Sequence, residues 1–123
     1  MGVRSQVIAA VLASCCAYSL PAKAGVSETL QTFEHGSPQE SQFIRVMLIA
    51  SEATLEAVNR YLVVHSSRPF YCMPEKLQLT PEQMVQVMRG YMDAKRPELP
   101  RVDAAPIADV LLYALEDTFP CAK

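Results

Sequence analysis

Residues 37–64 read SPQESQFIRVMLIASEATLEAVNRYLVV, and this stretch decides the fold because it is long, lacks glycine and is apolar at helical spacing. Ser37 is a candidate N-cap, Pro38 stands at the first helical position and Glu40 completes a capping box, so three signals predict a helix start. We expect one long helix, or two separated near Ser51, as the central element. The expected buried stripe is Phe43, Met47, Ala50, Thr54, Val58, Tyr61 and Leu62, widened by Ile44, Leu48, Leu55 and Val63. Such a wide apolar face predicts burial on more than one side.

Two further helices are expected downstream. The first begins at Thr80-Pro81-Glu82-Gln83, which repeats the capping box with proline, and it ends by Arg96 because Pro97 follows. The second has apolar residues at helical spacing from Ile107 to Thr118, with Asp103 or Ala105 as its expected cap. Residues 25–36 show little periodicity and are expected to form a loose arm. With no alternating run long enough for a strand, the predicted fold class is all-α: a small helical domain of three to five helices.

The first 24 residues are typical of a secretory signal peptide. Arg4 precedes an apolar run of about 14 residues, too short to span a membrane, which needs about 20. Ala22 and Ala24 then supply the small residues that precede cleavage, so we expect a periplasmic protein cut after Ala24 and not held at the membrane. The alternative is a lipoprotein anchored at Cys15, because Leu12-Ala13-Ser14-Cys15 resembles a lipobox.

Counting cysteines helps to choose between these two routes and to interpret Cys72. Cleavage after Ala24 leaves only Cys72 and Cys121, whereas cleavage before Cys15 leaves an unpaired Cys16 in an oxidising compartment. We therefore favour soluble export.

Cys72 has three candidate roles. A nucleophile needs a base within reach, and His35 and His65 are the only imidazoles. A zinc site could use Cys72, Cys121, His35 and His65, but no two of them have the short spacing usual in structural zinc sites. A Cys72–Cys121 disulfide would close a loop of about 50 residues and stabilise a small domain by roughly 4 kcal/mol, so this is the role that we predict.

Composition points away from several functional classes. Loss of the two cations of the leader, Arg4 and Lys23, moves the formal charge from −2 to −4, which argues against nucleic-acid binding. The chain has no phosphate loop, serine-nucleophile motif or zinc-protease motif, and we expect neither catalysis nor a cofactor. Methionines at helical spacing usually fill a core, although they can also line an adaptable groove. The methionines of this chain to which this applies are Met73, Met84, Met88 and Met92.

Four short motifs follow one another between residues 70 and 121. They are Tyr71-Cys72-Met73-Pro74, Thr80 to Gln83, Tyr91-Met92 before Pro97, and Ala114-Leu115 through Phe119-Pro120-Cys121. In this order they resemble the Rap/Tai family of immunity proteins associated with type VI secretion. The resemblance implies that residues 37–123 form a helical domain that binds and blocks a toxic effector, often a cell-wall-degrading enzyme. The resemblance is also compatible with a homodimer.

The upstream half departs from that family. Its members often have a glycine-containing helix there, sometimes with another cysteine, and ASEATLEAVNRYLVV at 50–64 has neither. The resemblance therefore covers the C-terminal half.

The candidate contact with such a partner is the turn 95–101, stiffened by two prolines and bearing both signs of charge. Its contact residues are Lys95, Arg96, Glu98, Leu99 and Arg101. A solvated connector is the simpler interpretation of the same residues. The alternative function is that of a periplasmic acid-stress chaperone, in which the methionine-bearing helix would bind unfolded clients at low pH.

Overall fold

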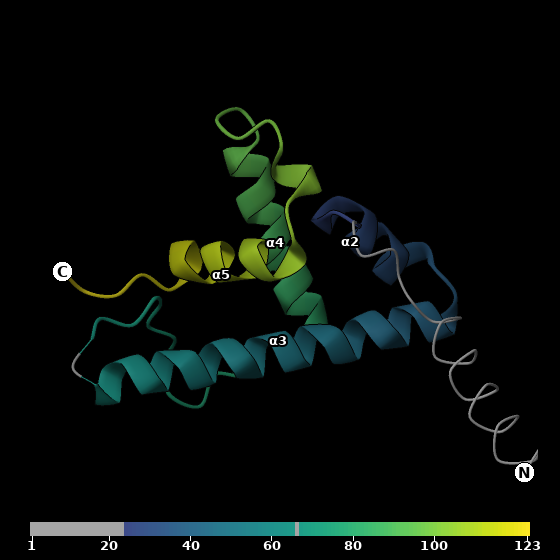
Figure 1. Ribbon diagram of the computed structural model, residues 1–123. Coiled ribbons are helices and arrows are strands. Elements are labelled where there is room, and N and C mark those ends of the chain that lie inside the picture. The colour runs from purple at the N-terminus through teal and green to yellow at the C-terminus, as the bar shows by residue number, and fades with distance from the viewer. Residues whose placement is uncertain (1–23, 66) are drawn as a thin grey trace, which may run out of the picture.

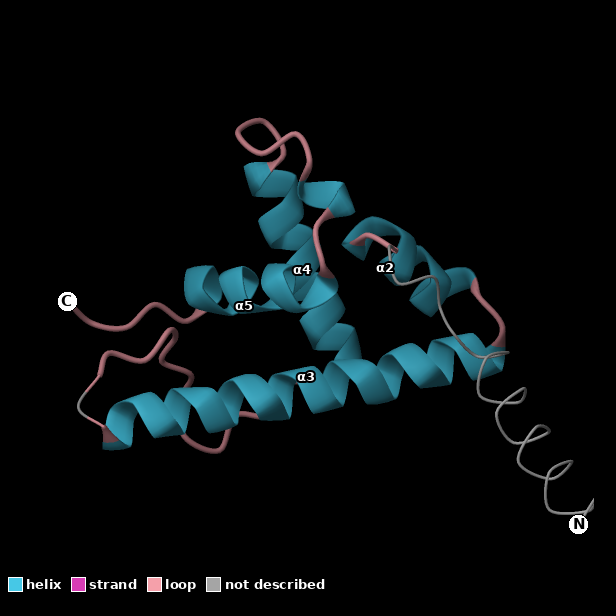
Figure 2. Ribbon diagram, viewed as in Figure 1, coloured by secondary structure: helices cyan, strands magenta, loops and turns pink. Residues whose placement is uncertain are grey.

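The computed structural model describes residues 24–65 and 67–123. In that part of the chain four α-helices are joined by loops, with one short 3₁₀ helix between the last two. They are α2 (Val26–His35), α3 (Pro38–Val64), α4 (Pro81–Lys95), η1 (Val102–Ala104) and α5 (Ile107–Thr118). Figure 2 shows helices and loops, and no strand, over the described residues. The prediction of an all-α domain of three to five helices with one disulfide is confirmed.

The proposed signal peptide falls outside the described residues except for Ala24, and Cys15 also falls outside them. Within the described part, no helix combines the length and the apolar character needed to cross a membrane.

Helix α3 is the base of the molecule. Its 27 residues make a rod of about 40 Å, and α2, α4 and α5 all lie on one side of it (Figure 1). The capping box predicted at its start is present: the Glu40 amide donates to Ser37 Oγ (3.3 Å), and the Ser37 amide donates to the Glu40 carboxylate (2.8 Å). The bond from the Ser37 amide holds the pKa of Glu40 below its usual value. The helix is continuous through Ser51, so the single-helix alternative is correct.

The core lies where α4 and α5 pack together above α3. Met84, Met88 and Met92 are buried on α4, so these three methionines fill the core, as predicted. The remaining buried apolar residues are Val26, Leu30, Ile44, Leu48, Tyr71, Val85, Val102, Val110, Leu111, Ala114 and Leu115. The core therefore draws on every helix.

The prediction of a loose arm over 25–36 is wrong, because most of this segment forms α2. Val26 and Leu30 are fully buried, and Phe33 packs against the core, so three apolar side chains one turn apart face inward. The Val26 amide also donates to the Ala105 carbonyl (2.9 Å), which ties α2 to the segment before α5. An isolated helix of ten residues is marginal in water. Tertiary contacts therefore stabilise α2.

The predicted buried stripe of α3 is also wrong in its orientation. The residues of α3 that are buried are Ile44, Leu48 and Asn59, whereas Phe43 is 50% exposed and Tyr61 is 61% exposed. Both faces of the helix are apolar, so spacing alone could not select the inner one. At α5 neither predicted cap is used, because Pro106 is the N-cap residue and has no side-chain hydrogen bond to the helix.

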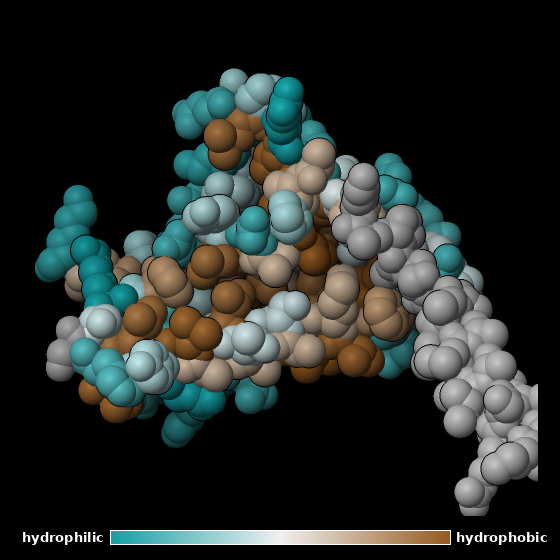
Figure 3. Space-filling model, in the orientation of Figure 1, coloured by the Kyte–Doolittle hydropathy of each residue, from teal (hydrophilic) through white to brown (hydrophobic). Residues whose placement is uncertain are grey.

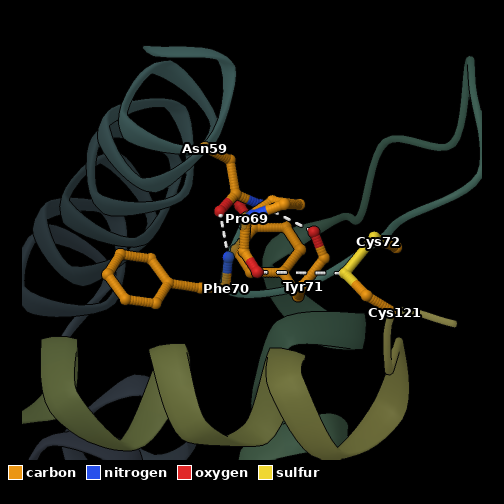
Figure 4. The surroundings of a disulfide bond; sticks show 6 residues. All are labelled: Asn59, Pro69, Phe70, Tyr71, Cys72 and Cys121. Carbon is orange, nitrogen blue, oxygen red and sulfur yellow. Dashed lines mark hydrogen bonds between the residues drawn. A yellow bond between two sulfur atoms is a disulfide. The ribbon is translucent and has the colours of Figure 1, made fainter. Parts of the chain in front are cut away.

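Asn59 attaches the connector between α3 and α4 to the helical base. Its Oδ1 accepts from the Phe70 amide and its Nδ2 donates to the Tyr71 carbonyl, each at 2.9 Å. Figure 4 shows both bonds beside the disulfide. The ring of Tyr71 is buried, and burial raises its pKa to about 12, with Glu52 and Glu56 acting in the same direction. Asn59 thus holds the backbone that carries Cys72.

We expect Asn59→Ala to lower the free energy of unfolding by about 3 kcal/mol, because two hydrogen bonds are lost and two backbone groups in a largely buried site lose their partner. Urea unfolding followed by circular dichroism measures this change. Val63→Ala, at an exposed position of the same helix, is the matched control and should stay within about 0.5 kcal/mol of wild type. A loss as small as that of the control would show that the connector does not depend on Asn59.

Candidate functional site

Cys72 and Cys121 form the predicted disulfide, with Cα atoms 4.9 Å apart and a separation of 49 positions in the sequence. The Cys72 amide donates to the Phe119 carbonyl (2.8 Å), so the connector runs beside the end of α5. Cys121 Sγ also lies 3.9 Å from the Pro69 carbonyl oxygen (Figure 4). With both sulfurs in the bond, neither is a free thiolate for nucleophilic attack or metal binding.

The two histidines lie at the ends of helices α2 and α3. His35 ends α2 with its ring 3.8 Å from the Glu34 carboxylate, and His65 stacks on Tyr61 just after α3. Among residues 24–65 and 67–123, no three His, Cys, Asp or Glu side chains are grouped as a metal site would require. The structure therefore does not bring the four candidate zinc ligands together.

The predicted contact turn projects from the far end of α4, at the top of Figure 1. It is closed by backbone bonds, since the amides of Glu98 and Leu99 donate to the Lys95 carbonyl at 2.9 and 2.7 Å. The Leu99 carbonyl in turn accepts from Val102 (3.0 Å) at the start of η1. Together with Pro97 and Pro100, these bonds limit the backbone freedom of the turn.

Arg96 braces the base of this turn. Its Nε and Nη2 donate to the two carboxylate oxygens of Asp103 (3.1 Å each), and its Nη1 donates to Asp93 (2.8 Å). The Arg96 guanidinium holds the pKa of Asp103 below its usual value. Arg96 was predicted to contact a partner, and its three hydrogen bonds within the chain also position the turn.

An open groove lies between the turn, α4 and α5, with a volume of about 410 Å³. Tyr91 of α4 and Tyr113 of α5 stack on one another there, with ring centroids 6.4 Å apart and planes 19° apart. The rest of the lining is Leu99, Pro100, Arg101, Val102, Ala105, Asp109 and Val110. Most of this lining is apolar, so the groove suits an apolar or aromatic side chain.

Charge is confined to a few groups around the groove. Arg101 and Asp109 supply one charge of each sign, and Lys95 Nζ lies 6.0 Å from the centre of the Tyr91 ring, at the limit of a cation–π contact. The groove can therefore cover an apolar side chain of a bound molecule and orient a polar group of that molecule at its margin.

The five predicted contact residues occupy different positions relative to the groove. Leu99 and Arg101 line the groove, Lys95 lies against Tyr91, Arg96 braces the turn, and Glu98 is exposed. Neither tyrosine was predicted to contact a partner: Tyr91 was noted only in the motif Tyr91-Met92, and Tyr113 was not selected. Tyr113 is 51% exposed. An aromatic residue outside the apolar stripe of α5 was the signal that could have identified it.

Comparison of the chain with protein-family models, with curated proteins and with solved structures finds no match.

Proposed function

We propose that this chain binds a second protein and blocks it, as an immunity protein blocks a toxic effector. The observation that carries the proposal is the open groove with stacked Tyr91 and Tyr113 beside the braced turn 95–101. The resemblance of residues 70–121 to the Rap/Tai family supports the same function. On that basis the partner is a cell-wall-degrading enzyme delivered by type VI secretion, and the encounter takes place in the periplasm.

The residue types at the groove support a protein contact. Tyrosine and arginine are enriched among the residues that dominate binding energy, especially where rings are already packed. Leu99 and Tyr113 are each about half exposed, so a partner would remove their surface from water on binding. A turn stiffened by proline and braced by Arg96 loses little conformational freedom in that step.

The direct experiment places this chain in the periplasm together with the product of the neighbouring gene, which the proposal predicts to be a secreted hydrolase. We expect cells to survive when both are present and to lyse when the hydrolase is produced alone. Killing that persists, with this chain folded and oxidised in the periplasm, would refute immunity toward that hydrolase.

Variants of the groove locate the contact on the chain. We expect Leu99→Ala/Tyr113→Ala to weaken binding of the same hydrolase by about a hundredfold in calorimetry, because two apolar anchors are lost. Leu77→Ala is the control, since Leu77 is also exposed but lies before the opposite end of α4. Equal affinities for both variants would move the contact away from the groove.

The chaperone alternative makes a different prediction. It requires suppression of aggregation of many model proteins near pH 2 to 3, which light scattering detects, whereas the immunity proposal requires one tight partner at neutral pH.

A further inference from the structure

The two cysteines of the disulfide differ in their exposure to solvent. Cys72 is exposed, whereas Cys121 is half-buried. Cys72 also stands in the irregular connector between α3 and α4, where Pro74 favours extended backbone in the residue before it. Labile and regulatory disulfides belong to the exposed class, because a thiolate must reach one of the two sulfurs to break the bond. This disulfide is therefore open to attack at Cys72.

A hollow of about 450 Å³ lies on the Cys121 side of the bond. Its wall includes Cys121, Arg68, Phe70, Glu116 and Lys123, but not Cys72. In Figure 3, strongly hydrophilic side chains, in teal, project at the left, where the chain leaves α5 in Figure 1.

The charges in this wall distinguish the two sulfurs. Two cationic side chains, Arg68 and Lys123, stand against the single carboxylate side chain of Glu116. Cations near a sulfur favour its thiolate form, and a thiol that ionises readily leaves a disulfide faster. A sulfur released at Cys121 is therefore stabilised as an anion, which makes Cys121 the better leaving group.

We propose that Cys72 is a site of thiol–disulfide exchange with a protein that carries an adjacent pair of cysteines. One thiolate of that protein attacks Cys72 Sγ, an intermolecular S–S bond forms, and Cys121 leaves as a thiolate. The second thiolate of the partner then attacks the partner's own sulfur in the mixed disulfide and releases Cys72. Two electrons pass from the partner, which becomes a disulfide, to this chain, whose two thiolates take protons from water.

Contacts outside the bond allow the exchange to be reversed. Asn59 holds the connector by its bonds to the Phe70 amide and the Tyr71 carbonyl, and the Cys72 amide donates to the Phe119 carbonyl (2.8 Å). Both thiols therefore stay close after reduction. Once protonated, Cys121 Sγ can donate to the Pro69 carbonyl oxygen, which lies 3.9 Å from it. The reduced chain is thus a folded state from which the same bond can form again.

Exchange at Cys72 connects the stability of this chain to the redox state of its compartment. The bond restricts the unfolded chain, so its reduction increases the fraction of unfolded molecules while the folded ones keep their helices. The disulfide is then a reversible link between the connector and the end of α5. This inference does not rest on the proposed function, and it uses no residue of the groove.

Trapping the mixed disulfide tests which sulfur is attacked. Oxidised wild-type protein is incubated with a thioredoxin whose second active-site cysteine is replaced by serine, so that the intermediate cannot resolve. We expect an adduct with the mass of both chains, in which peptide mass spectrometry finds thioredoxin on Cys72 and a free thiol at Cys121. An adduct on Cys121, or the absence of any adduct, would overturn the proposal.

The kinetics of reduction by dithiothreitol, without denaturant, test whether the folded protein reacts. We expect the rate to rise in proportion to the dithiothreitol concentration while circular dichroism stays helical, because the exposed sulfur is attacked directly. A rate that levels off at high concentration would mean that opening of the fold limits the reaction, and this result would also overturn the proposal.

A pair of charge variants tests the hollow in the same assay. We expect Arg68→Gln to slow reduction by about threefold, because the leaving thiolate loses a nearby cation. Arg60→Gln removes the same charge from an exposed position of α3 outside the hollow and should react at the wild-type rate. Equal rates for the two variants would refute the role assigned to the hollow.

Discussion

Cys72→Ser/Cys121→Ser is expected to lower the free energy of unfolding by about 4 kcal/mol, because the disulfide spans 49 positions and restricts the unfolded chain. For a small domain whose total stability is about 5 to 15 kcal/mol, this is a large share. Urea unfolding monitored by circular dichroism measures it. Wild type treated with a reducing agent should give the same midpoint as the double variant.

The structure indicates why the folded state should survive that change. The Cys72 amide still donates to the Phe119 carbonyl, and Asn59 still holds the connector, so the two segments remain neighbours without the covalent bond. The variant is therefore expected to be helical but less stable. A change below about 1 kcal/mol would mean that the disulfide adds little to these contacts.

Leu30→Ala is expected to cost about 3 kcal/mol, since it removes a fully buried side chain from the core and leaves a cavity. The loss corresponds to a fall of roughly 12 to 24 °C in the melting temperature of a domain of this size. Calorimetry provides the measurement.

Gln31→Ala is the matched control for Leu30, because the neighbouring side chain is exposed and should change stability by less than about 0.5 kcal/mol. If both variants melted at the wild-type temperature, α2 would be an accessory arm and not part of the domain.

Local signals in the sequence located the starts of α3 and α4 correctly. Ser37 with Glu40, and Thr80 with Gln83, form the capping boxes that their spacing predicts. Such signals are reliable because each involves residues within one turn, and proline at the first helical position adds to both. The methionines of α4 were also placed correctly, since polar residues mark its outer side.

Features that depend on contacts between helices were predicted wrongly or not at all. Helix α2 has too few apolar residues to show a clear period, and its order comes from contacts with α3, α4 and η1. Among these is the pair of bonds from Arg89 to Glu34, at 3.0 and 2.7 Å. In the groove, the turn was predicted, but Tyr91 and Tyr113 are 22 positions apart and meet only because α4 and α5 pack together.

The sequence by itself determined the all-helical class, the two capped helix starts and the pairing of Cys72 with Cys121, once residues 1–24 were set aside. These features depend on nearest neighbours along the chain or on a count of cysteines. Only the tertiary structure decided which apolar side of α3 turns inward and that residues 26–35 are helical. Those outcomes depend on which other segments cover a surface, and the free energy of that covering comes from residues far apart in the chain.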